Sequence, residues 1–149
     1  MHTISEQELR QIQDKLQRLQ NMAPDGVAGI LNIELISMAA DRQSCVFRAN
    51  TAAWMKNAGG TLHGGMIATV LDHAMGALLY SIKDGDAFCP TIEMQASYHR
   101  PLIPGKDVLI RTRVVAKTRR LGHMAAEVVQ EDAPEITCAS GTSIYFLTD

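Results

Sequence analysis

The chain lacks several features that would assign it to a large class of proteins. Its three cysteines, Cys45, Cys89 and Cys138, are scattered and odd in number. They fit neither a disulfide framework nor a zinc site, and they indicate the reduced thiols of a cytoplasmic protein. With a formal net charge of -2 and no run of lysine or arginine, the sequence predicts no nucleic-acid partner. The first ten residues are polar and acidic, unlike a secretory signal.

Long apolar runs are also scarce. Asp72 and His73 interrupt the best candidate for an 18-residue apolar span, so we expect no membrane partner. The hydrophobic share of 46% and charged share of 20% are those of an ordinary globular protein. At 149 residues the chain is long enough to bury a core, and we expect a single folded domain at 23–149.

Residues 1–22 are predicted to be a helical extension that precedes this domain. Ser5 and Glu8 have the spacing of a capping box, in which each side chain accepts a hydrogen bond from the other's backbone. Apolar residues then recur every three or four positions from Leu9 to Leu19, which predicts one helix face and a helix that ends near Asn21.

The remaining elements alternate between turn signals and apolar runs. Strands are predicted at 30–38 and 44–50 as a hairpin, and at 91–98, 108–117, 123–131 and 136–146 as a consecutive meander. Between them, a helix begins near His63 or Gly64 and extends to about residue 80. One long helix against antiparallel strands predicts an α+β domain.

This helix contains one acid that conflicts with its surroundings. Apolar residues cover nearly every side, so the helix is predicted to be buried. Burying the Asp72 carboxylate is costly unless it is paired or performs chemistry. At the other end, the first-turn amides of Gly64 and Gly65 have no partner within the helix and favour negative charge. Gly65 N–H is therefore a candidate donor to the oxyanion of an acyl transfer.

The spacing of these groups predicts a homodimer. Asp72 lies seven residues after Gly65, which places the two roughly 10 Å apart along the helix axis. A catalytic carboxylate must lie within hydrogen-bond reach of the reacting atoms, so both residues of one helix cannot serve one site. A second, antiparallel copy of the helix would bring its Asp72 to this Gly65 and create two equivalent sites.

Two stretches of the sequence resemble a known family. The first is Asn57-Ala-Gly-Gly-Thr-Leu-His63-Gly64-Gly65, with Asp72 nine residues after the histidine. The second is 91–101, a strand that ends in an aromatic residue, a basic residue and a proline. Over roughly residues 25–147 the chain is similar to the hotdog-fold acyl-CoA thioesterases of the phenylacetate-pathway (PaaI-like) branch. The resemblance implies a long helix wrapped by an antiparallel sheet, and subunits that associate as dimers or tetramers.

The resemblance also implies roles for five catalytic residues. Asp72 would be the nucleophile or the general base that activates water, and Gly65 N–H would polarise the thioester carbonyl. Asn57 would orient the water or the acid, and His63 would hold the loop or the carbonyl side. Thr91 stands where the family often has a hydroxyl near the water.

Substrate binding is expected at two further places. Gly64 lets a ligand approach the backbone closely. Arg119 and Arg120, in the turn 117–122, match the region that often contacts the CoA phosphates, for which arginine is well suited. The resemblance implies an acyl-CoA substrate and no metal or redox cofactor.

Each of these residues also has a purely structural interpretation. His63 could cap the helix, Asn57 could bond its own loop, Thr91 could reflect β-propensity, and the arginines could be solvated. His73 points roughly 100° away from Asp72 and is expected to be packed or interfacial. Cys89 lacks an activating partner in the sequence, and His63, Asp72 and His73 do not have metal-ligand spacing.

Three other functions stay open at this level. The main alternative is a non-catalytic acyl-CoA-binding module or regulator that keeps the pocket without turnover. A hotdog dehydratase or hydratase is disfavoured because its motifs are not found here. A purely structural protein is the third.

Overall fold

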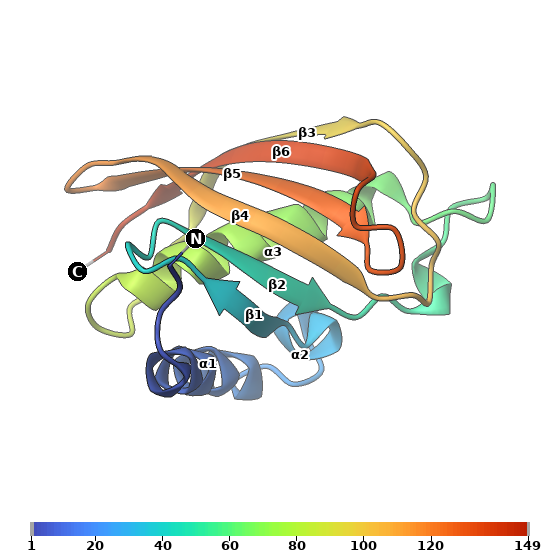
Figure 1. Cartoon of the computed structure of the whole chain (residues 1–149). Helices are drawn as coiled ribbons and strands as arrows, with labels where there is room; N and C mark the ends of the chain where they lie inside the picture. Colours follow the sequence, from blue (N-terminus) through green and yellow to red (C-terminus); the bar gives the residue numbers. More distant parts are fainter. Residues whose placement is uncertain (1, 149) are drawn as a thin grey trace.

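A six-stranded antiparallel sheet curls around one long helix (Figure 1), as the computed structural model, which describes residues 2–148, shows. The helix is α3 (Gly64–Ile82), and His63 is its N-cap. The strands are β1 (Glu34–Met38), β2 (Ser44–Ala49), β3 (Thr91–Tyr98), β4 (Val108–Lys117), β5 (Leu121–Gln130) and β6 (Thr137–Phe146). The predicted α+β hotdog arrangement, a long central helix wrapped by an antiparallel sheet, is confirmed.

The order of the strands differs from the predicted meander. It is β1-β2-β4-β5-β6-β3, so β3 pairs with the last strand and β4 pairs with β2. The meander of four consecutive strands is therefore wrong, and only β4, β5 and β6 follow one another. Period-two alternation identifies a strand but not its partner, and the segment 99–107 is long enough to carry the chain from one side of the sheet to the other.

The N-terminal helix α1 (Glu6–Asn21) forms as predicted. The backbone N–H of Ser5 donates to Glu8 Oε2 at 3.0 Å, and that of Glu8 donates to Ser5 Oγ at 3.3 Å, which completes the capping box. The buried face of the helix includes Ile12 and Leu16. A division at residue 22 into extension and domain stays a prediction.

A second short helix, α2 (Val27–Leu31), replaces the beginning of the first predicted strand. Asn32 ends α2 in the left-handed conformation, with a φ of 43°, which asparagine adopts more readily than most residues. The strand then begins only at Glu34. The predicted strand 30–38 is thus wrong in its first four residues, where apolar side chains belong to a helical turn.

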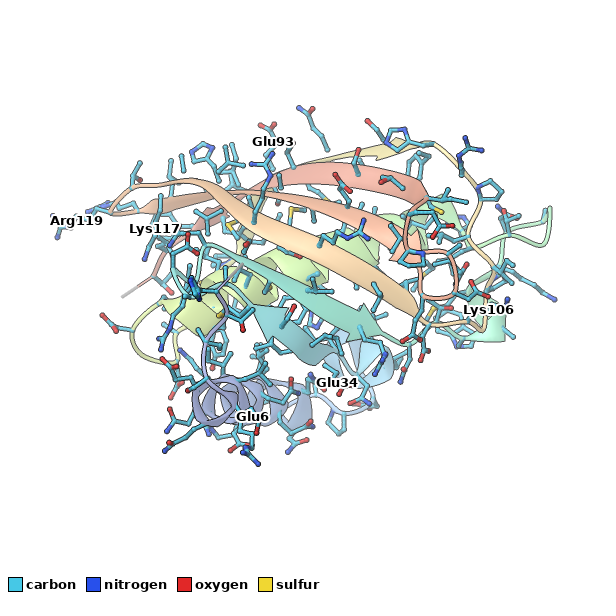
Figure 2. The ribbon with its side chains drawn as sticks, viewed as in Figure 1. Glu6, Glu34, Glu93, Lys106, Lys117 and Arg119 are labelled. Carbon is cyan, nitrogen blue, oxygen red and sulfur yellow. The ribbon has the colours of Figure 1, made fainter. Side chains whose placement is uncertain are left out.

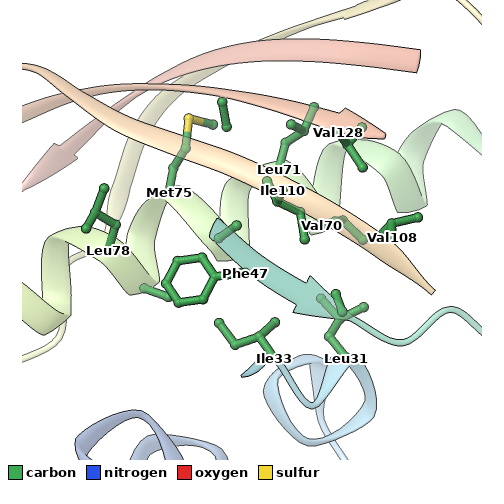
Figure 3. Close-up of a cluster of buried hydrophobic side chains, with 14 of the residues drawn as sticks. Leu31, Ile33, Phe47, Val70, Leu71, Met75, Leu78, Val108, Ile110 and Val128 are labelled. Carbon is green, nitrogen blue, oxygen red and sulfur yellow. The ribbon is translucent and has the colours of Figure 1, made fainter. Parts of the chain in front are cut away.

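The core lies between α3 and the sheet. Figure 3 shows Leu71, Met75 and Leu78 of α3 facing Phe47 of β2 and Ile110 of β4, all of them fully buried. By length and composition alone α3 could cross a membrane, despite Asp72 and His73, and 56% of its apolar window is buried within the protein. The prediction that the chain contains no apolar span of this length is therefore wrong. The sheet supplies the apolar surroundings that the helix requires.

Candidate active site

Two hydroxyl groups hold the Asp72 side chain. Thr91 Oγ1 donates to Asp72 Oδ1 at 2.9 Å. The Tyr145 hydroxyl lies 2.8 Å from Asp72 Oδ1 and 2.6 Å from the Asp72 carbonyl oxygen. Thr91 and Tyr145 are paired residues of β3 and β6, so the sheet register presents both hydroxyls to the same turn of α3. The acid of the buried helix is thus paired, and Thr91 is one of its partners.

Sequence reasoning missed Tyr145. Its ring lies over Gly76, one helical turn after Asp72, where an added Cβ would be 3.2 Å from Tyr145 Cε1. Burial raises the pKa of the Tyr145 hydroxyl far above its ordinary value, so the group stays a hydrogen-bond donor. A buried tyrosine needs a polar partner, and the acid on an otherwise apolar helix was the signal that could have identified it.

Removing the Tyr145 hydroxyl is expected to destabilise the protein. In Tyr145→Phe the carboxylate keeps only Thr91, and the free energy of unfolding should fall by about 1.5–3 kcal/mol, the usual effect for a hydrogen bond to a charged group. Urea unfolding measures this. The matched control is Tyr98→Phe, which removes an exposed hydroxyl that donates to the Gly64 carbonyl at 2.7 Å and should change stability by less than about 0.5 kcal/mol. Equal losses in the two variants would contradict the assignment.

The beginning of α3 forms a second cluster. The Gly65 N–H donates to His63 Nδ1 at 2.9 Å, so His63 acts as the helix cap. Asn57 bonds its own loop, because its side-chain N–H₂ donates to Thr61 Oγ1 at 2.9 Å and its Oδ1 accepts from the Thr61 N–H at 3.1 Å. In the single chain, His63 therefore caps the helix and Asn57 bonds its own loop, which are the structural interpretations of these two residues. Gly65 N–H becomes free for a ligand only when the His63 ring turns away.

Within one chain the two clusters stay apart. Asp72 and Thr91 come together at the middle of α3, whereas Asn57, His63 and Gly65 lie at its beginning, about 10 Å away along the axis. Asp72 and Gly65 of one helix are therefore too far apart to serve the same site. A site that uses both clusters requires a second copy of α3.

The basic turn between β4 and β5 lies at the Asp72 end of the sheet. Gly122 of β5 pairs with Tyr145, and the Arg120 carbonyl accepts from the Leu147 N–H at 2.8 Å. Arg119 projects from the tip of the turn (Figure 2). Among residues 2–148, neither Arg119 nor Arg120 forms an ion pair, so both guanidinium groups are available to an anion.

A cavity within the described residues 2–148 adjoins these residues, and a larger hollow on the sheet does not. A cavity of about 350 Å³ has Asp72, Thr91 and Tyr145 in its lining. A larger hollow of about 580 Å³, whose lining includes Arg111 and Glu127, contains none of the predicted site residues. We assign the smaller cavity to the candidate site because Asp72, Thr91 and Tyr145 line it.

His73 is half-buried, and its Nε2 atom is enclosed without a hydrogen-bond partner in the described part of the chain. Burial lowers the pKa of His73 below its ordinary 6.5, and the nearby Asp72 carboxylate opposes this shift. The histidine is packed, as predicted, and it is neutral where the protein is folded at neutral pH.

This burial predicts acid sensitivity. Below pH 6.5 the unfolded chain protonates His73 while the folded chain does not, so stability falls as pH decreases, by up to about 1.4 kcal/mol per pH unit. Urea unfolding between about pH 7.5 and 5 should show this slope reduced in His73→Gln. The exposed control His2→Gln should keep the wild-type slope, and an unchanged slope in His73→Gln would contradict the explanation.

Two other chemistries have little support. Cys89 is buried, and burial raises the pKa of its thiol, which opposes formation of the nucleophilic thiolate. Among residues 2–148, no group of three or more His, Cys, Asp and Glu side chains is arranged to hold a metal ion.

The fold and this acid site define a hotdog domain with a hydroxyl-held carboxylate on its central helix. A family model described as the thioesterase superfamily matches residues 59–137, more than half of the chain, and the protein belongs to that superfamily. Comparison with curated protein sequences gave no match.

Solved structures support the same fold. A phenylacetic acid degradation-related protein of Ralstonia eutropha is 21% identical with a TM-score of 0.75, over 89% of this chain and 99% of its own. Thioesterase superfamily member 2 of Mus musculus is 18% identical with a TM-score of 0.75, over 97% and 100%. The E. coli PaaI protein, from the phenylacetic acid degradation operon, is 20% identical with a TM-score of 0.71, over 93% and 96%.

Proposed function

We propose that the protein is an acyl-CoA thioesterase that hydrolyses a thioester to a free acid and CoA at a site shared by two subunits. The observation that carries the proposal is the Asp72 carboxylate, held by Thr91 and Tyr145 beside an apolar cavity. Membership of the thioesterase superfamily supports hydrolase activity in general. The acyl-CoA substrate and the role of Asp72 are inferred from the residues.

In the proposed reaction Asp72 acts as a general base. It removes a proton from water, and the hydroxide oxygen forms a bond to the thioester carbonyl carbon. The resulting oxyanion accepts a hydrogen bond from the Gly65 N–H of a second copy of the chain. When the C–S bond breaks, the CoA thiolate takes the proton from Asp72 and the free acid remains. Attack by Asp72 itself, followed by hydrolysis of the anhydride, gives the same products.

The other predicted residues would assist. His63 turns away from Gly65 when the carbonyl enters, and Asn57 orients the water or the acid. Gly64 allows the substrate close to the backbone, and Arg119 and Arg120 bind CoA phosphates through charge-assisted hydrogen bonds. We place this homo-oligomeric enzyme in the cytoplasm, where its three free cysteines stay reduced.

Release of free thiol from a panel of acyl-CoA substrates tests this proposal. Wild-type protein should hydrolyse at least one acyl-CoA, and should use the matching acyl-pantetheine less well because that substrate lacks the phosphates that Arg119 and Arg120 would bind. Tight binding of acyl-CoA without thiol release would instead support the non-catalytic module. The occupation of Gly65 N–H by His63 is the one observation that favours that alternative.

A further inference from the structure

The Tyr145 hydroxyl has two acceptors within reach of its one hydrogen. Its oxygen lies 2.6 Å from the Asp72 carbonyl oxygen and 2.8 Å from Asp72 Oδ1, and both distances are those of O–H···O hydrogen bonds. A phenol carries a single O–H hydrogen, so it donates fully to one acceptor at a time. The hydroxyl can therefore exchange acceptors by rotating about its C–O bond, without any movement of the ring.

The two hydroxyls of the site are directed at the same carboxylate oxygen. Thr91 Oγ1 lies 2.9 Å from Asp72 Oδ1 and 3.2 Å from Oδ2, so its one hydrogen favours Oδ1, which the Tyr145 hydroxyl also contacts. Among residues 2–148, Asp72 Oδ2 has no hydrogen-bond partner besides this longer contact. Oδ1 is therefore the oxygen that is held, and Oδ2 is the oxygen that is open to take a proton from water.

The cavity lining contains no cation that balances the Asp72 charge. Its other titratable side chains, besides Tyr145, are His73, Tyr80 and Cys89. Burial lowers the pKa of His73 and raises the pKa values of Tyr80 and Cys89, so all three are neutral near pH 7. The lining residues that come from α1 and α2 are apolar, and Asp72 forms no ion pair within the described chain. The charge of Asp72 is thus stabilised by hydroxyl groups.

We propose that Tyr145 is a positioning residue for the proton transfers of Asp72, and that its hydroxyl changes acceptor when Asp72 changes its protonation state. The proposal rests on the proposed thioesterase function. While Asp72 is ionised, the hydroxyl donates to the charged Oδ1. Once Oδ2 has taken a proton, Oδ1 is no longer charged, and the hydroxyl donates to the Asp72 carbonyl oxygen, which is the nearer of the two.

This exchange supports both protonation states of the acid. Asp72 takes a proton from water on Oδ2 as the water oxygen bonds to the carbonyl carbon, and the CoA thiolate takes that proton when the C–S bond breaks. The Tyr145 hydrogen is transferred in neither step and changes only its acceptor. A donor fixed on Oδ1 would favour the ionised form alone and would oppose the first transfer. A hydroxyl that can turn to the backbone avoids this cost and keeps a partner throughout.

Gly76 allows the ring to approach the helix. A Cβ added at Gly76 would lie 3.2 Å from Tyr145 Cε1, which is closer than an ordinary van der Waals contact. A side chain at this position would therefore push the ring away from α3. The Gly76→Ala variant keeps every hydrogen-bonding group of the site, and alanine favours a helix more than glycine does, so this variant displaces the hydroxyl in a protein that folds.

The pH dependence of kcat tests the proposal. In Tyr145→Phe we expect the highest kcat to fall at least about tenfold, because the carboxyl loses one of its two fixed contacts, while KM stays within about twofold of wild type. The ionised acid also loses a donor, so the acid limb of kcat should move to higher pH by about one unit. Gly76→Ala should change both quantities in the same direction and by less. The same comparison in a His73→Gln background removes any contribution of that histidine to the limb.

The matched control is Thr137→Val. It removes a hydroxyl that donates to another carboxylate, Glu127 Oε2, at 3.2 Å between β6 and β5. Neither residue lines the cavity beside Asp72. This variant should therefore keep the wild-type kcat and the wild-type acid limb.

A measurement without turnover separates this proposal from the thioesterase proposal. Carbon-13 NMR of protein labelled at the aspartate carboxyl groups follows the protonation of Asp72, whose signal is the one absent from Asp72→Asn. The midpoint of its titration should rise by about one pH unit in Tyr145→Phe and stay unchanged in Thr137→Val. If this shift occurs while wild-type protein hydrolyses no acyl-CoA, the coupling of Tyr145 to the acid stands and the thioesterase proposal is wrong.

Two results would overturn the role of Tyr145. In the first, wild-type protein releases thiol and Tyr145→Phe keeps both the wild-type kcat and the wild-type acid limb, so the thioesterase proposal stands without this residue. In the second, kcat falls in Tyr145→Phe while neither the acid limb nor the Asp72 carbon signal moves. Tyr145 would then support only the fold.

Discussion

Replacing Asp72 by asparagine is expected to lower kcat for acyl-CoA hydrolysis by at least about 100-fold, the low end for losing an acid–base group. The amide has nearly the same shape as the carboxylate, so Thr91 can still donate to its oxygen. The asparagine amide, however, cannot accept a proton from water. The measurement is thiol release at saturating substrate, with folding checked by circular dichroism and urea unfolding.

The size of the decrease in kcat distinguishes a catalytic carboxylate from a structural one. If Asp72 only braces the helix against β3 and β6, Asp72→Asn should change stability and leave kcat within about threefold of wild type, far less than loss of a general base. The Thr91→Val variant is an informative comparison. It removes the hydroxyl that donates to Asp72 Oδ1 at 2.9 Å but leaves the Asp72 carboxylate in place. Its loss of kcat should be smaller than that of Asp72→Asn, and the reverse order would contradict the proposed reaction.

Mixing two inactive variants is expected to restore activity. Asp72→Asn lacks the base, and Gly65→Pro lacks the N–H that would bind the oxyanion, at a helix position where proline is tolerated. In a mixed dimer one site combines both defects and the other combines both intact residues. Co-expression in equal amounts makes half of the dimers mixed, so activity should recover to about a quarter of wild type.

This recovery depends on the site being shared. If Asp72 and Gly65 served a site within one chain, every chain in the mixture would carry a defect and no activity would return. Co-expression of Asp72→Asn with Asp72→Ala is the control, since no mixed dimer then contains an intact base. Recovery also shows that the Gly65→Pro chain is folded, because its Asp72 must act in the active site of the mixed dimer.

The sequence was sufficient to identify the central helix and its acid. Turn chemistry before His63 and the nearly all-apolar run after it specify where α3 begins, and the Ser5–Glu8 pair specifies where α1 begins. These features depend on residues close together in the chain, so local physics determines them. The superfamily was also recognisable from the glycine-rich stretch and its spacing to Asp72.

What the sequence did not reveal depends on contacts between distant segments. The pairing of β3 with β6 brings Tyr145, 73 residues later, to Asp72, and no local pattern specifies that partner. The short helix α2 was missed because its five residues are too few for helical periodicity to be distinguished from strand alternation. The sequence left two interpretations of His63 open, a catalytic role and a helix cap, and the hydrogen bond from Gly65 N–H corresponds to the second.

The division of the cavity between two parts of the chain has an evolutionary consequence. The groups at Asp72 depend on α3, β3 and β6, whereas part of the cavity lining comes from residues between 19 and 28, which lie outside all three. Substitutions at these positions change the lining of the cavity while the residues that hold Asp72 stay the same. The amino-terminal part of the lining and the part that holds Asp72 can therefore change independently of each other in evolution.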